Sequence, residues 1–131
     1  MRERVVITDA GFEAVLGTVL VLGAVFGDID SDDFPAPGTT AVIAIFGIAL
    51  WLLAVGLAEV VKREAVSDRL LLVLAVGNSA FALLIAIWVL VADGFSDVGS
   101  AVVWVTAACL MLLAGAQVVT LATQPRGESN R

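Results

Sequence analysis

The stretch Leu70 to Ala92 reads LLLVLAVGNSAFALLIAIWVLVA and holds about 23 residues without a charged side chain. As an α-helix, a stretch of this length crosses the roughly 30 Å hydrocarbon core of a bilayer. Asn78 and Ser79 form one polar pair inside it. The stretch therefore predicts a membrane-spanning helix that carries an amide side chain within the membrane.

Three further stretches have the same apolar character, and acidic or basic loops separate them. The chain is 60% hydrophobic with a mean hydropathy of +1.04, which is typical of a compact integral membrane protein. We expect an all-α, four-helix transmembrane bundle, with residues 1–131 as a single membrane domain and successive helices as antiparallel neighbours. The predicted helices run over residues 10–27, 41–61, 70–92 and 101–123.

The start of the chain superficially resembles a secretory signal, because Arg2 and Arg4 precede an apolar run. The run is long and Glu13 interrupts its start, so we expect a retained first helix. Thr8 or Asp9 is the expected N-cap of this helix, because either side chain can accept from a free backbone N–H one turn later.

The basic residues all fall on one side of the predicted spans, whereas the opposite loops, 28–40 and 93–100, hold only aspartates as charged residues. The seven basic residues are Arg2, Arg4, Lys62, Arg63, Arg69, Arg126 and Arg131. Because cytoplasmic loops are enriched in Lys and Arg, both termini and the 62–69 loop are predicted to be cytoplasmic. The net charge of −6 with a single lysine suggests a prokaryotic source, so together with the four spans we expect a multi-pass protein of a prokaryotic cell membrane. The same acidity excludes nucleic acid as a partner, because no basic face is present to contact phosphates.

A weak internal repeat relates the two halves of the chain. AVIAIFGIALWLLA (41–54) aligns with AVVWVTAACLMLLA (101–114), and a shift of 65 places Glu13 on Asn78. This suggests two tandem parallel helical hairpins, although the general similarity of apolar helices explains the match equally well.

Small and aromatic residues indicate where helices pack and where the membrane ends. Gly23 and Gly27 form a GxxxG pair in the first span, with Gly17 further in, which predicts close approach of a neighbouring helix. Trp88 and Trp104 lie near the 93–100 loop and suit an aromatic belt at that interface.

Each predicted span contributes one strongly polar residue to its cytoplasmic half. At about 1.5 Å per residue, Glu59 lies roughly 3 Å deep, Glu13 roughly 6 Å, Gln117 roughly 9 Å and Asn78 roughly 12 Å. An unpaired amide or carboxyl group is costly in hydrocarbon, so these four side chains should face one another or water.

One interpretation of this polar layer is packing alone. Asn78 and Gln117 would hydrogen-bond across the bundle, and Glu59 would pair with Lys62 or Arg63 one turn away. The expected partners are then the lipid bilayer and either a second copy of the chain or another membrane protein. This interpretation predicts a small structural or accessory subunit that assembles with itself or with a larger membrane complex.

The other interpretation is a site open to the cytoplasm, in which Glu13 exchanges a proton and Asn78 and Gln117 bind a solute. The segment EAVLGT (13–18) resembles the small multidrug-resistance transporters, which are also short four-helix proteins with a membrane glutamate in their first helix. The resemblance implies a minimal proton-coupled transporter or channel that uses Glu13. This chain departs from that family in having no tyrosine and in its one-sided basic residues.

Other chemistry has little support in the sequence. There is no histidine and one cysteine, Cys109, which excludes an internal disulfide and His/Cys metal or haem sites, so we expect no metal and no cofactor. The serines lack a base, so we expect no enzyme. The aspartates at 28, 30, 32 and 33 begin like an EF-hand loop but lack its glycine and closing glutamate, which favours a solvated turn over a calcium site.

Overall fold

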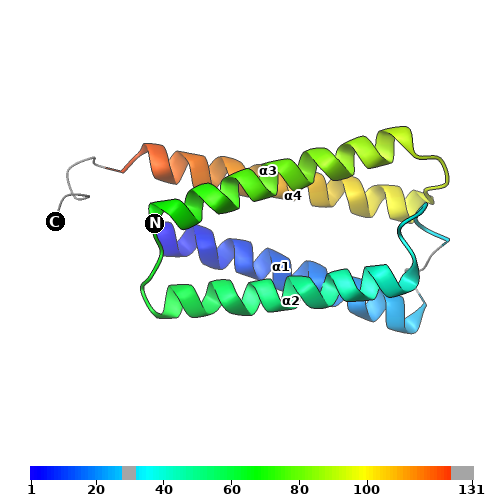
Figure 1. The fold of residues 1–131 in the computed structure, drawn as a ribbon, viewed down its shortest axis with the longest axis horizontal. Coiled ribbons are helices and arrows are strands. Elements are labelled where there is room, and N and C mark those ends of the chain that lie inside the picture. The colour runs from blue at the N-terminus through cyan, green and yellow to red at the C-terminus, as the bar shows by residue number, and fades with distance from the viewer. Residues whose placement is uncertain (28–31, 125–131) are drawn as a thin grey trace.

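The computed structural model describes residues 1–27 and 32–124, and in these ranges every regular element is an α-helix. The helices are α1 (Arg2–Phe26), α2 (Thr40–Lys62), α3 (Asp68–Val91) and α4 (Asp97–Ala122) (Figure 1). All four are long and apolar enough to cross a membrane, which confirms the predicted helical fold and fits a multi-pass membrane protein. Several residues singled out in the sequence lie outside the described ranges: Asp28, Asp30, Arg126 and Arg131.

The main difference from the predicted bounds is at the start of α1. This helix begins at Arg2, with Met1 at its N-cap, and not at Ala10. The predicted cap at Thr8 or Asp9 is therefore wrong, because both residues lie inside the helix and the Thr8 hydroxyl donates to the Arg4 carbonyl at 2.7 Å. No glycine or proline interrupts residues 2–9, so the helix extends to the chain start.

The helices form two closely packed pairs, α1 with α2 and α3 with α4, and the pairs meet mainly through α1 and α4. Helices α1 and α2 approach each other closely at Gly17 and Gly47, where a Cβ added to Gly17 would lie 2.7 Å from the Gly47 carbonyl oxygen. Gly17, which the sequence marked together with Gly23 and Gly27, thus lies at a close helix contact. Gly27 instead ends α1 in a left-handed conformation with φ of 76°.

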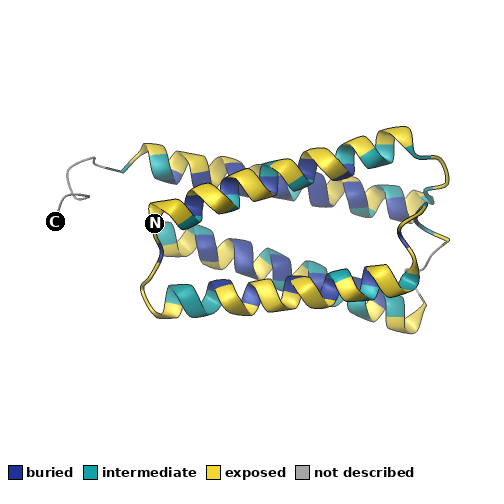
Figure 2. Cartoon of the chain, in the orientation of Figure 1, coloured by how far each residue is buried: buried dark blue, intermediate teal, exposed yellow. Residues whose placement is uncertain are grey.

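Buried residues of all four helices lie on the faces turned toward the middle of the bundle (Figure 2). Many of the exposed residues are Val, Leu and Ile. Such extensive apolar exposure is unusual for a protein surrounded by water. It is the surface that lipid tails would contact.

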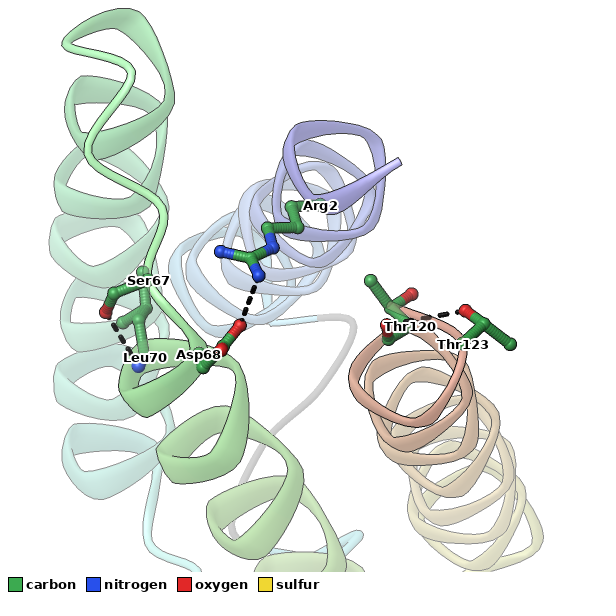
Figure 3. A network of polar contacts seen from close by, with 6 residues as sticks. All are labelled: Arg2, Ser67, Asp68, Leu70, Thr120 and Thr123. Atoms are coloured by element: carbon green, nitrogen blue, oxygen red, sulfur yellow. Dashed lines mark hydrogen bonds and ion pairs between the residues drawn. The ribbon is translucent and has the colours of Figure 1, made fainter. Parts of the chain in front are cut away.

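We call the end of the bundle that carries Arg2, Lys62 and Arg69 the basic end, and the end that carries Asp33 and Asp97 the acidic end. At the basic end, an ion pair of 2.6 Å between Arg2 and Asp68 joins the starts of α1 and α3 (Figure 3).

At the acidic end, the segment before α2 crosses to the start of α4. The backbone N–H of Ser96 donates to the Asp33 carbonyl at 3.1 Å, and the Ser96 hydroxyl donates to the Asp33 carboxylate. The Ser96 oxygen also caps α4 by accepting from the Gly99 N–H at 2.9 Å. These contacts tie the two helix pairs together at this end.

Three rings, which we call the aromatic cluster, pack beneath this crossing: Phe34, Trp88 and Phe95. Phe34 stacks on Trp88 with ring centroids 6.1 Å apart, and Phe95 meets Trp88 edge-on at 4.7 Å. Trp88 is thus half-buried against two other rings, whereas Trp104 is 44% exposed.

Helices α2 and α3 follow one another in the chain but lie apart along most of their length. The stacked rings of Phe46 and Phe81, with centroids 5.4 Å apart, bridge the space between them. The bundle is therefore closed along α1 and α4 and loosely packed along α2 and α3.

Candidate functional site: a buried polar cluster

Polar side chains from three helices meet inside the bundle, nearer to its basic end. We call this group the polar cluster, and its members are Asp9 and Glu13 of α1, Asn78 of α3, and Gln117 and Thr120 of α4. Their exposed fractions are 1%, 4%, 8%, 0% and 0%, respectively. The cluster is thus sealed from the surface despite its polarity.

A single carboxylate oxygen is the centre of the cluster. Asp9 Oδ2 accepts hydrogen bonds from Gln117 Nε2 at 2.6 Å and from Asn78 Nδ2 at 3.1 Å. Asn78 Nδ2 also lies 3.3 Å from Gln117 Oε1, to which it donates. Each of these three side chains therefore contacts the other two, and together they join α1, α3 and α4.

Two carboxylate oxygens in the cluster have no hydrogen-bond partner among the described residues. They are Asp9 Oδ1 and Glu13 Oε2, and both atoms are inaccessible to solvent. Asp9 and Glu13 are four positions apart in α1, so their side chains share a helix face. The cluster consequently has more acceptor capacity than the protein's own donors use.

The charge of these two carboxyl groups is not balanced by a nearby basic side chain in the part of the chain that the structure describes. The ion pairs there join Met1 with Glu3, Arg2 with Asp68, and Arg63 with Glu59. Burying an ionised carboxylate without a cation costs considerable free energy. Asp9 offsets part of this cost through its two amide donors, whereas Glu13 Oε2 has none.

Thr120 completes the cluster without bridging helices. Its hydroxyl donates to the Ala116 carbonyl in the preceding turn of α4 at 2.8 Å. This is the usual way in which a threonine satisfies its donor inside an apolar helix.

The structure brings together three of the four polar residues singled out in the sequence. Asn78 and Gln117 bond directly, and Glu13 is buried in the same cluster. Glu59 lies elsewhere, with a side chain that is 45% exposed and accepts from Arg63 Nε at 2.8 Å.

Sequence reasoning missed Asp9, the residue to which both amides donate. Asp9 was interpreted as a helix cap because the first span was expected to begin at Ala10. The available signal was the four-residue spacing of Asp9 and Glu13, which places both carboxyl groups on one face once the helix begins at Arg2.

Two hollows in the surface lie close to the bundle interior, and neither is lined by a member of the polar cluster. The larger is an apolar cavity of about 470 Å³ in the acidic half, between the helix pairs. The smaller, of about 160 Å³, lies between α1 and α4 beside Arg4, Thr8 and Ala116. The polar cluster is therefore separate from both of these hollows.

Among the described residues, no group of three or more His, Cys, Asp or Glu side chains is placed to hold a metal ion. Comparison of the chain with protein-family models, with curated proteins and with solved structures finds no match. The arrangement of the chain's own residues is therefore the basis for any functional argument.

Proposed function

We propose that this chain is a small structural or accessory protein of a prokaryotic cell membrane, with both termini in the cytoplasm, that assembles with itself or with a larger membrane complex. The observation that carries the proposal is the closed arrangement of Asp9, Asn78 and Gln117. Their amide donors are directed to groups within the same bundle.

A site for a polar solute needs donors and acceptors that converge on a cavity. In this bundle the two amides bind one carboxylate oxygen in a region sealed from solvent. Hydrogen bonds between membrane helices are each worth on the order of 1 kcal/mol and select which helices pair. The cluster is thus suited to fixing the arrangement of α1, α3 and α4.

Outward-facing glycines support assembly with another membrane protein. Gly56 of α2, Gly77 of α3 and Gly115 of α4 have no atom within 4 Å of the position where a Cβ would lie. Small residues on a membrane helix allow the backbone of a second helix to approach closely. These glycines do not pack against another helix of the described bundle. We therefore infer that they contact another chain.

The test is to purify the protein in mild detergent, identify what co-purifies with it and compare Leu variants of the three glycines. Within the single bundle each substitution has free space and removes a poor helix former, so the fold should be kept. At least one of Gly56→Leu, Gly77→Leu and Gly115→Leu should reduce assembly about tenfold or more, while Glu13→Gln should leave it intact. A wild-type chain that is monomeric and co-purifies with no partner would overturn the proposal.

One observation favours a second candidate, a minimal proton-coupled transporter or channel. Glu13 Oε2 and Asp9 Oδ1 are buried without partners among the described residues, which a purely structural cluster does not need. A carrier of this kind should transport its solute in proteoliposomes under an imposed pH gradient, and Glu13→Gln should abolish transport. Transport that persists in this variant would exclude a role for Glu13.

A further inference from the structure

The apolar cavity in the acidic half has a floor on one side of the bundle and a rim on the other. Its floor includes Leu20 of α1 and Val103 of α4, both of which are buried. Its rim includes Val42 of α2, Leu84 of α3 and Ile87 of α3, which are 45%, 64% and 55% exposed. The cavity therefore opens sideways, between α2 and α3, onto the surface that faces lipid in a membrane.

We propose that this cavity binds one acyl chain of a membrane lipid, inserted sideways between α2 and α3. This goes beyond the proposed structural role, because it assigns a ligand to a part of the bundle distant from the polar cluster.

Water is a poor occupant because the lining offers it almost no hydrogen bonds. The lining side chains are aliphatic or aromatic except for Thr106. The indole N–H of Trp88 is buried without a hydrogen-bond partner among the described residues, so it is a single isolated donor, whereas a buried water needs two to four polar partners. The Thr106 hydroxyl already donates to the Val102 carbonyl at 2.7 Å. Cavities without polar groups remain dry, and an empty cavity of this size would leave its walls without van der Waals contacts.

The size of the cavity favours a chain that is thinner than a helix. Its volume of about 470 Å³ lies within the range of roughly 300–1,000 Å³ that is usual for small-molecule sites. A helix is about 10 Å across with its side chains, so this volume would admit only about one turn of it. A second copy of the protein could therefore place no more than a few side chains here, whereas a flexible acyl chain is thin enough to enter.

Two sets of rings determine how the occupant enters. Phe34 and Trp88 of the aromatic cluster line the cavity toward the acidic end, where the Asp33–Ser96 contacts hold the loop in place. Phe46 and Phe81 line it where α2 and α3 are bridged. These two sets of rings close the cavity toward the acidic end and at the bridge between α2 and α3. An acyl chain would therefore enter from the hydrocarbon layer through the opening between Val42 and Leu84.

The experiment uses the full chain reconstituted in dioleoyl-phosphatidylglycerol bilayers, extracted in mild detergent and weighed by native mass spectrometry. The blocking variant is Leu84→Trp, whose larger side chain stands at the rim of the cavity. The matched control is Leu83→Trp, because Leu83 is equally exposed on α3, at 60%, and does not line the cavity.

Wild type and Leu83→Trp should retain one lipid per chain, and Leu84→Trp should retain about tenfold less. Any of three outcomes would overturn the proposal. The wild type could retain no lipid, both variants could retain lipid equally, or the protein could form a lipid-free dimer that excludes added lipid.

A second measurement does not depend on the folding of the Leu84 variant. Lipid with a brominated acyl chain quenches a tryptophan that it contacts, and Trp88 lines the cavity whereas Trp104 does not. After detergent washing, a protein with Trp88 as its only tryptophan should stay quenched, and one with only Trp104 should recover. Equal recovery of both would contradict binding in the cavity.

Discussion

Gln117 in the last helix donates a hydrogen bond of 2.6 Å to the Asp9 carboxylate in the first helix, across 108 positions of sequence. The same oxygen accepts from Asn78 in α3. Because one atom serves two donors, the removal of Asp9 and the removal of either amide should have different consequences for the stability of the bundle.

Asp9→Leu should lower the free energy of unfolding by about 1–3 kcal/mol, because it leaves two buried amides without their shared acceptor. Asp9→Asn keeps an oxygen at the same position and should retain most of the stability. Unfolding in mixed micelles, followed by tryptophan fluorescence, measures both variants. Equal losses would mean that the acceptor oxygen is not what stabilises the cluster.

Asn78→Leu and Gln117→Leu should be energetically coupled, because these side chains bond to each other and to Asp9. A double-mutant cycle should give a coupling energy of about 0.5–1.5 kcal/mol. The control pairs Asn78→Leu with Thr18→Val, since Thr18 accepts from Trp51 Nε1 at the α1–α2 contact and does not contact Asn78. That pair should be additive.

Glu59→Gln should change the free energy of unfolding by less than about 0.5 kcal/mol. Its partner Arg63 is 74% exposed, and ion pairs at such sites contribute little in water. The same denaturation assay detects a larger effect, which would show that Glu59 has a contact beyond Arg63.

Gly99→Ala should destabilise the acidic end of the bundle. A Cβ at Gly99 would overlap the Asp33 carbonyl oxygen, which is held by the Ser96 N–H, so the loop would have to move away from α4. Gly115→Ala on the same helix has free space and should be neutral or stabilising by up to about 1 kcal/mol. Hydrogen exchange of the Ser96 amide should accelerate only in the Gly99 variant.

The predicted orientation can be tested with single cysteines in a Cys109→Ser background. Glu64 lies in the loop between α2 and α3, and Asp93 follows α3 at the acidic end, and both are exposed. In intact cells, a membrane-impermeant thiol reagent should label Asp93→Cys but not Glu64→Cys. The opposite pattern would place the basic end outside the cytoplasm.

The number of helices could be predicted from hydropathy, because a protein has few other uses for four long apolar stretches. The length of α1 could not, because its charged first turns fall outside the apolar stretch. The pairing of Asn78 with Gln117 followed from the cost of burying amides singly in hydrocarbon. The role of Asp9 could not be predicted, since an aspartate suits a helix cap as well as a buried hydrogen-bond acceptor. Only the residue at which α1 begins distinguishes these two roles.

Glycine spacing placed Gly17 at a helix contact, but it could not identify Gly47 of α2 as its partner. Gly17 and Gly47 face each other because the helices cross there, and the crossing point depends on how every neighbouring side chain packs. The cavity between α2 and α3 was equally beyond prediction. Its residues have the same apolar types as those that fill the core elsewhere, so composition does not reveal where the helices separate.

The Asp9–Asn78–Gln117 contacts also constrain the order of events during synthesis. α1 emerges from the ribosome first, and its carboxyl group meets its last donor only when α4 has been made. Until then the nascent chain carries Asp9 and Glu13 in an incomplete bundle. A chain terminated before Gln117 would therefore lack the closing bond and should be a preferred substrate for membrane quality-control proteolysis.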